Sequence, residues 1–230
     1  MDPEKLLKLD LSYPGISYGY HSWALELYLE SIESFVAQAS DQYRKQGELR
    51  LEAKKGRLDE AEVSLKQNFI DEAADVHIPA YARMSAIVLI WGLFESTVFD
   101  ITAYVTRREG ASLKLREIRA DSFENQVRKY YSNVLNIELT WTEDQVDRIT
   151  NLHKVRNAIA HRNGKYLDAA KAKRESIAQL ANSVTGIFFQ DSQLFISKVY
   201  VEESAELVFS MLGDLSKHIG QYYDGPIVKG

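Results

Sequence analysis

The sequence has no cysteine among its 230 residues. Disulfides, thiolate chemistry and the cysteine spacing of zinc fingers are therefore excluded. There is no excess of positive charge either, because 28 Lys and Arg stand against 33 Asp and Glu, which gives a net charge of −5 and a pI of about 5.6. This balance argues against an avid, non-specific binder of nucleic acid, although a local basic patch remains compatible with it.

Several familiar signatures are also missing. The sequence has no Gly-rich phosphate loop, no Gly-x-Ser-x-Gly and no His-Glu-x-x-His, and we expect neither a metal nor a cofactor. The first residues lack the charged and then apolar pattern of a signal peptide. The longest uncharged run in the middle of the chain, Met84 to Phe94, is too short to span a bilayer. These absences predict a cytoplasmic protein without a membrane segment.

What the sequence does contain is mostly helical periodicity. Residues 1–20 are expected to form an irregular lead-in, with a helix beginning at His21. Residues 38–67 are heavily charged in both signs and predict a charged helical arm, which either is solvated or pairs with another chain. Leucines recur every seven residues along the arm, as in a short heptad trace. They are Leu51, Leu58 and Leu65.

Further helices follow the arm. The most apolar one is expected from Ile78 to Val105, and others are expected at 122–135, in the stretch that ends before Gly164, at 166–182 and at 201–222. Two short apolar runs around a polar tetrapeptide predict a small β-hairpin at 185–197. The sequence shows no repeat and no interdomain linker, so we expect one all-α domain over 1–230, a helical bundle with a small C-terminal β-hairpin.

The most informative stretch is 155–164, which reads Val-Arg-Asn-Ala-Ile-Ala-His-Arg-Asn-Gly. Thr142 and Gln145 form a plausible capping box that starts its helix, and Gly164 is suited to end it. His161 then lies in the last turn, on the same face as Asn157. Arg156 is five residues from His161, roughly 140° round the helix. Its side chain must bend back, or a second chain must help, before both groups reach one phosphate.

The chemistry available to this pair is narrow. A histidine that titrates near neutrality takes a proton from a ribose 2′-OH or gives one to a leaving 5′-oxygen. The planar fork of an arginine suits the extra negative charge of a phosphorane-like transition state. Other residues near the motif could bind an RNA substrate, three of them as a local basic patch and one by stacking on a base. They are Lys154, Arg162 and Lys165 for the patch, and Tyr166 for the stacking.

A plainer interpretation of the same residues exists. Cations are common near helix C-termini, because the helix dipole favours them there. The remaining histidines, including His153, are expected at the surface or at the edge of the core, although His153 lies three residues before Arg156 and could border the site.

The fuller string, Arg156-Asn157-x-Ile159-Ala160-His161-x-x-Gly164, resembles the motif of HEPN domains, small helical proteins of prokaryotic defence and toxin–antitoxin systems. The resemblance implies a HEPN-like bundle with metal-independent endoribonuclease activity in toxin–antitoxin or antiphage defence. In that reading His161 is the general acid or base, Arg156 stabilises the phosphorane, and Asn157 contacts the phosphate or holds the histidine tautomer. Cleavage leaves a 2′,3′-cyclic phosphate.

The resemblance also implies partners. The expected assembly is a homodimer whose two motifs meet in one composite site, with a nucleotidyltransferase-like protein as an antitoxin partner. An acidic residue on the apolar helix often lies near the motif in such proteins, and here Glu95 is the candidate for orienting Arg156 or His161. A salt bridge that only joins two helices is the alternative for Glu95. For the whole chain, a non-catalytic HEPN-like module that binds a protein, nucleotide or RNA stays open, as does a purely structural bundle.

Overall fold

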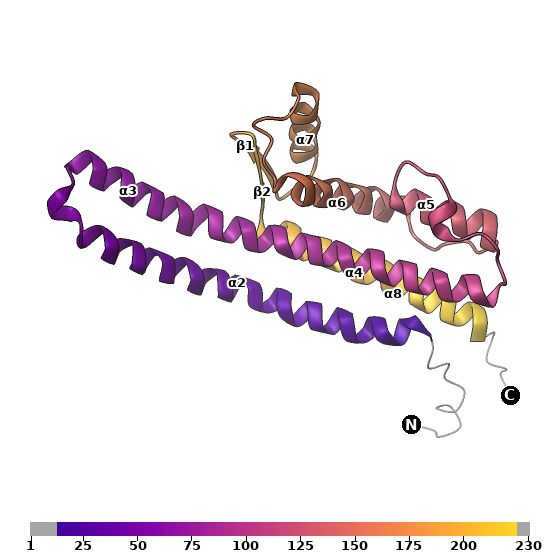
Figure 1. The fold of residues 1–230 in the computed structure, drawn as a ribbon. Coiled ribbons are helices and arrows are strands. Elements are labelled where there is room, and N and C mark those ends of the chain that lie inside the picture. The colour runs from indigo at the N-terminus through magenta and orange to yellow at the C-terminus, as the bar shows by residue number, and fades with distance from the viewer. Residues whose placement is uncertain (1–12, 225–230) are drawn as a thin grey trace, which may run out of the picture. The chain divides into compact units, whose positions relative to one another are not determined.

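A computed structural model describes residues 13–224, and helices account for 79% of the chain. This confirms an all-α protein with a small antiparallel hairpin near its C-terminus. The elements, labelled in Figure 1 where there is room, are α2 (Pro14–Glu52), a 3-10 turn (Lys55–Arg57), α3 (Glu60–Glu72), a π turn (Ala73–His77), α4 (Ile78–Arg108), a 3-10 turn (Leu115–Glu117), α5 (Phe123–Tyr130), a π turn (Tyr131–Leu135), α6 (Glu143–Arg162), α7 (Lys171–Ser183), β1 (Ile187–Gln190), β2 (Gln193–Ile196) and α8 (Lys198–Asp224).

The described residues group into two compact parts. Unit 1 contains 13–25, 90–154 and 204–224, and unit 2 contains 26–89 and 155–203. The boundaries fall inside α2, α4, α6 and α8 and not at a linker. A single domain over 1–230 stays a prediction.

The core of unit 1 is built from aromatic and aliphatic side chains. Trp91 and Phe94 of α4 are fully buried and lie against each other, with ring centroids 5.5 Å apart. The indole of Trp141 is also buried, and its Nε1 donates to the carbonyl of Met211 on α8 at 3.1 Å. Apolar burial of this kind supplies most of the driving force for folding.

The predicted helix at 122–135 is α5 followed by a π turn. Where α5 passes into the π turn, the rings of Tyr130 and Tyr131 are both fully buried. The Tyr130 hydroxyl donates to the carbonyl of Leu113 at 2.6 Å, and Thr102 donates to the Tyr131 hydroxyl at 3.2 Å. Burial raises the pKa of Tyr131.

In unit 2 the C-terminal half of α2 pairs antiparallel with α3 and the start of α4 (Figure 1). Arg83 donates two hydrogen bonds of 2.8 Å to the Glu33 carboxylate. Further along, Ser40 Oγ donates to the carbonyl of Ala74 at 2.6 Å, and Arg44 pairs with Asp71 at 3.0 Å. The charged segment 38–67 thus forms an antiparallel helical hairpin, in which the end of α2 packs against α3 of the same chain.

The heptad interpretation of this segment was wrong. Leu51 lies in the last turn of α2, Leu58 follows the 3-10 turn, and Leu65 lies on α3. Because the chain reverses between them, the three leucines do not share a helix face.

The ends of two helices also differ from expectation. Helix α2 begins at Pro14, so 14–20 is helical and not irregular, and a proline in the first turn suits a helix start. Within unit 1, the Tyr18 hydroxyl of this turn donates to the carbonyl of Phe209 at 3.1 Å. Residues 1–12 of the expected lead-in lie outside the described residues. Helix α7 begins at Lys171, because Tyr166 instead donates its backbone N–H to Ser192 O at 2.7 Å.

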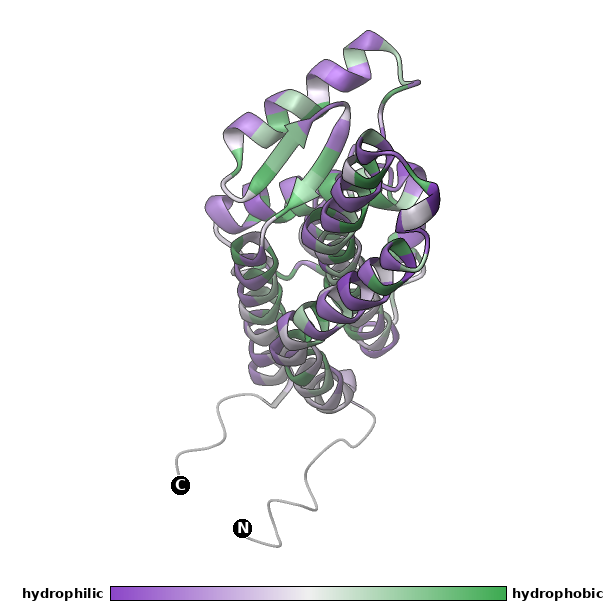
Figure 2. Ribbon diagram, turned by 90° about the vertical axis from the view of Figure 1, so that its left-hand side faces the viewer, coloured by the Kyte–Doolittle hydropathy of each residue, from purple (hydrophilic) through white to green (hydrophobic). Residues whose placement is uncertain are grey.

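The hairpin predicted at 185–197 is confirmed. Strands β1 and β2 are antiparallel and largely hydrophobic (Figure 2), with Ile187 opposite Ile196 and Gln190 opposite Gln193. The two turn residues, Asp191 and Ser192, have φ values of 48° and 62°, the left-handed region that tight hairpin turns use.

Among the described residues, one helical stretch, Glu60–Arg108, is long and apolar enough by composition to cross a membrane. Its most apolar window has a mean hydropathy of 1.6, and half of that window is buried inside the protein. The uncharged run Met84 to Phe94 is shorter, because it ends at the charged residues on either side, whereas a membrane-spanning helix can contain one or two charges. The core helix of a soluble protein passes the same test, so this stretch is weak evidence for a membrane.

Candidate functional site at the end of α6

Helix α6 begins as its sequence predicts. The backbone N–H of Gln145 donates to Thr142 Oγ1 at 3.2 Å, and the backbone N–H of Thr142 donates to Gln145 Oε1 at 2.9 Å. This is the reciprocal pair of a capping box. The apolar residues that predicted the helix are all buried, which fixes the rotation of the helix about its axis. They are Val146, Ile149, Leu152, Val155 and Ile159.

A left-handed turn ends α6. Asn163 has φ +51° and Gly164 has φ +71°, and the backbone N–H of Asn163 donates to Ile159 O at 2.7 Å. A Cβ on Gly164 would lie 3.0 Å from Met84 Cε and 3.3 Å from Leu194 O. Both the backbone angle and the close approach of Met84 and Leu194 therefore favour glycine at this position.

Arg156 is held at the surface of unit 2 by its neighbour. Its Nη1 donates to Asn157 Oδ1 at 2.9 Å, and its Nε is buried although the residue as a whole is partly exposed. The amide of Asn157 orients the guanidinium, and within residues 13–224 it makes no side-chain hydrogen bond to His161. The expected role of Asn157 in holding the histidine tautomer is therefore not observed in this chain.

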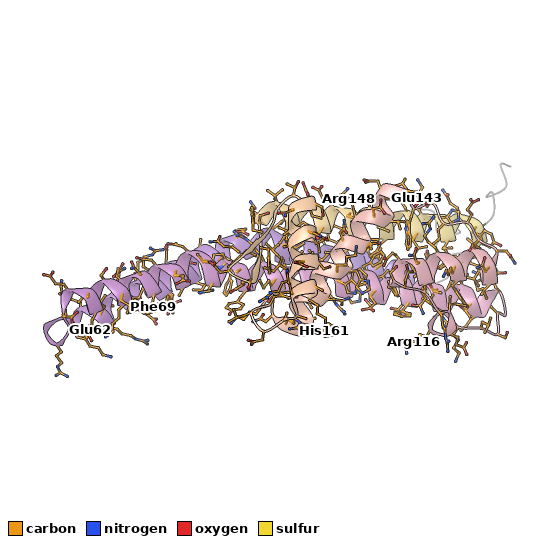
Figure 3. All side chains as sticks on the ribbon, turned by 90° about the horizontal axis from the view of Figure 1, so that it is seen from above. Glu62, Phe69, Arg116, Glu143, Arg148 and His161 are labelled. Carbon is orange, nitrogen blue, oxygen red and sulfur yellow. The ribbon has the colours of Figure 1, made fainter. Side chains whose placement is uncertain are left out.

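His161 is exposed in the last turn of α6 (Figure 3). Across the described part of the chain, its imidazole makes no hydrogen bond and no ion pair, with Arg156 or with any other residue. The five-residue spacing still places the two side chains roughly 140° apart round the helix. One chain therefore presents both groups without joining them.

The cations near His161 also lie on the surface of unit 2. Arg162 and Lys165 are exposed, and the Arg162 guanidinium lies 5.6 Å from the centroid of the Tyr166 ring, a cation–π distance. Tyr166 itself is only 7% exposed and its ring meets Phe189 edge-on at 6.0 Å. Burial raises the pKa of its hydroxyl, although Arg162 opposes this.

The expectation that Tyr166 stacks on a base was therefore wrong for this structure. Its backbone N–H is bonded to Ser192 in the hairpin turn, and its ring packs against Phe189 and beneath the Arg162 guanidinium.

The two other residues proposed for the site belong to unit 1. Glu95 lies partly exposed on α4 between the buried Trp91 and Val98, and Lys154 is exposed on α6. The orienting role of Glu95 and the substrate contact of Lys154 stay predictions.

Unit 1 contains a polar cluster that the sequence did not reveal. Glu124, fully buried on α5, accepts a hydrogen bond of 2.6 Å from Thr150 Oγ1. Nδ1 of His153 lies 3.7 Å from Glu124 Oε2, an ion-pair distance that is too long for a hydrogen bond. The imidazole of His153 is stacked on the buried Trp91, with ring centroids 4.4 Å apart and planes 11° from parallel.

The environment of Glu124 favours its charged form. Burial alone raises the pKa of this carboxyl, but the nearby His153 imidazole and the hydroxyls of Ser122 and Thr150 outweigh burial and give a pKa of about 2. Ser122 is the N-cap of α5, and its side chain accepts the backbone N–H of Asn125. Thr150 and His153 are three residues apart on one helix, which is the only local sign in the sequence that they act together. Their contact with Glu124 has no local sign, because 26 residues separate Thr150 from Glu124.

Among the described residues, no group of three or more His, Asp or Glu side chains is placed to hold a metal ion. A scan of the chain against models of known protein families, and searches among curated proteins and solved structures, find no match.

Proposed function

We propose that this chain is a metal-independent endoribonuclease of the HEPN type and that its helices form a HEPN-like bundle. The observation that carries the proposal is the end of α6, where an exposed imidazole follows a partly buried guanidinium that Asn157 holds in place. The glycine turn after Arg162 leaves His161 open to a large substrate.

In the proposed reaction, one His161 imidazole takes the proton of a ribose 2′-OH. The 2′-oxygen attacks the adjacent phosphorus, and the 5′-oxygen leaves with a proton from a second acid. The guanidinium of Arg156 binds the non-bridging oxygens as negative charge develops on them. The products are a 2′,3′-cyclic phosphate and a free 5′-hydroxyl, and no metal ion takes part.

The separation of Arg156 and His161 supports a homodimer as the active form. With the two groups roughly 140° apart on one helix, a second copy completes the site by presenting its own His161 to the same phosphate. One imidazole then acts as the base and the other as the acid. We place the enzyme in the cytoplasm, in toxin–antitoxin or antiphage defence, with a nucleotidyltransferase-like antitoxin as its partner.

The test is cleavage of RNA by purified protein in EDTA. We expect the wild type to produce 2′,3′-cyclic phosphate ends and His161→Ala to lose activity. His21→Ala, which alters an exposed histidine on α2, is the matched control and should cleave as the wild type does. A substrate with a 2′-deoxyribose at the cleaved position should resist. Equal cleavage by the wild type and the His161→Ala protein would overturn the proposal.

A non-catalytic HEPN-like module that binds RNA, a nucleotide or a protein is the second candidate. The observation that favours it is the lack of any hydrogen bond to the His161 imidazole among residues 13–224. A protein that sediments as a monomer and binds RNA without cleaving it would support this alternative.

A further inference from the structure

The segment 155–174 is strongly basic in a chain whose net charge is −5. It contains six Lys and Arg and a single acidic residue, Asp168. The four that are exposed follow the helix end, the turn and the start of α7. They are Arg162, Lys165, Lys171 and Lys173.

Contacts within unit 2 join these cations into one surface, which we call the α7 surface. Arg174 Nη1 donates to the carbonyl of Leu167 at 3.2 Å, which holds the first turn of α7 to the loop before it. Lys165 pairs with Gln193 of the hairpin as an isolated β-bridge. The cations of the loop and of α7 are thereby kept together.

The N-terminus of α7 adds to the positive field. Its N-cap residue, Ala170, has no side chain to accept a backbone N–H, and the first turn contains no acidic residue. The N–H groups of this turn and the helix dipole both favour an anion there. Lys171 and Lys173 stand in the same turn, and Lys171 is exposed and lies 3.7 Å from the Glu175 carboxylate. A phosphate bound at this end therefore meets the helix dipole and the lysine charges, and Lys171 exchanges a surface ion pair for it.

A concavity lies at the other end of α7. It has a volume of about 640 Å³ and is lined by residues 181–190, from the last turns of α7 to β1. The ring of Phe188 is 57% exposed there. Amide and hydroxyl groups line the same concavity, as a nucleobase edge requires. They are Asn182, Ser183, Thr185 and Gln190.

The hairpin connects the cations to this concavity. Lys165 bridges to Gln193, which lies opposite Gln190 in the register of β1 and β2. Phe188 precedes Gln190 by two residues in β1, which places it roughly 7 Å from Gln190 at the rise of a strand. A chain with phosphates on Lys165 and the start of α7 therefore passes within reach of the Phe188 ring.

We infer that the α7 surface binds single-stranded RNA. The exposed cations hold the phosphates, and an unpaired base stacks on Phe188 in the concavity. A stacked base must lie outside a duplex, which selects single strands over double-stranded RNA. The choice of RNA as the ligand rests on the proposed function, whereas the surface itself rests on the charges and contacts above.

The experiment measures binding of a fluorescein-labelled single-stranded oligoribonucleotide to the full-length His161→Ala protein in EDTA, over a range of salt concentrations. The double variant Lys171→Ala, Lys173→Ala should bind more weakly. Its plot of log affinity against log salt should be shallower by about 1.4, because each lost phosphate contact removes about 0.7 on single strands. Lys54→Ala, Lys55→Ala removes two exposed lysines elsewhere in unit 2 and should change neither quantity.

Phe188 is tested separately. Phe188→Ala should weaken binding about tenfold or more and leave the salt dependence unchanged, because stacking involves no counterion release. Phe188→Tyr keeps a ring in place and should restore the affinity.

Two results overturn the inference: equal affinity of the two double-lysine variants, or duplex RNA of the same sequence binding as tightly as the single strand. Because binding is measured in the His161→Ala protein, these results say nothing about cleavage. Wild-type protein that binds RNA through this surface but does not cut it contradicts only the proposed function.

Discussion

Helix α6 carries two histidines whose surroundings are opposite. In unit 1, His153 is stacked on Trp91 and faces the buried carboxylate of Glu124. In unit 2, His161 is exposed and has no hydrogen-bond partner among the described residues. By local geometry alone, His153 resembles an oriented acid–base group more closely, yet the sequence motif designates His161.

The difference teaches how to weigh orientation against access. The stacking of His153 on Trp91 and its proximity to Glu124 fix it at the edge of the core of unit 1, where these contacts contribute to stability. His161 is exposed and has no orienting group among the described residues, so under the proposed function its orientation would have to come from the substrate or from a second chain. Catalytic hydrogen bonds are often absent or long before the substrate binds.

The largest expected effect is the difference in RNA cleavage rate between the His161→Ala and His153→Ala proteins. We expect His161→Ala to reduce the rate of RNA cleavage by about 10²- to 10⁴-fold, the usual contribution of a general acid or base. His153→Ala should lower the melting temperature but change the cleavage rate much less. Single-turnover rates with excess enzyme, alongside thermal unfolding, measure both effects. A larger loss of rate in His153→Ala than in His161→Ala would reverse the assignment.

The Glu124 cluster should make stability depend on acid pH. The carboxyl has a pKa of about 2 in the folded protein against 4.5 ordinarily, so its stabilisation is complete above pH 4.5 and is lost as the pH falls towards 2. This shift corresponds to a contribution of the carboxyl to the free energy of unfolding on the order of 3 kcal/mol.

Urea unfolding from pH 7 to pH 2 should therefore show a steeper loss of stability for the wild type than for Glu124→Gln, which cannot ionise. At pH 7 the variant should be the less stable of the two, and curves that run parallel over the whole range would contradict the prediction. Glu138→Gln, at an exposed carboxylate before α6, serves as the control.

A side chain at Gly164, in the turn that follows His161, should destabilise the protein. Gly164→Ala introduces a Cβ at φ +71° and 3.0 Å from Met84, and we expect a loss of about 1–2 kcal/mol in the free energy of unfolding. Gly92→Ala has the opposite expectation, because Gly92 is exposed within α4 and a Cβ there meets no atom within 4 Å. It should stabilise the protein by about 0.5–1 kcal/mol. Chemical denaturation measures both, and equal signs would contradict the prediction.

The smallest effect concerns the N-cap of the helix that carries both histidines. Thr142→Ala removes the acceptor for the Gln145 N–H and should cost about 1 kcal/mol of stability. Thr140→Ala, an exposed position just before the helix, should be close to neutral. Thermal unfolding of the two variants provides the measurement. Similar melting temperatures for both would show that the cap contributes little.

Features set by neighbouring residues were predictable from the sequence. Thr142 with Gln145 gave the start of α6, Gly164 gave its end, and the polar turn gave the hairpin. The reversal of the chain at Lys55–Arg57 was missed, because a leucine every seven residues is compatible with one long helix and with two short ones.

The polar part of unit 1 could not be predicted for a different reason. The pairing of Glu124 with Thr150 and His153 joins two helices that no sequence pattern links. The same limit applies to Tyr166, whose backbone N–H donates to Ser192 in the turn of the hairpin, 26 residues along the chain.

The backbone N–H of Leu194 donates to the carbonyl of Gly164 at 2.9 Å, and the Leu194 carbonyl oxygen would lie only 3.3 Å from a Cβ on that glycine. Strand β2 is thereby fastened to the residue that closes α6. A displacement of the hairpin should therefore shift the last turn of α6, which carries His161.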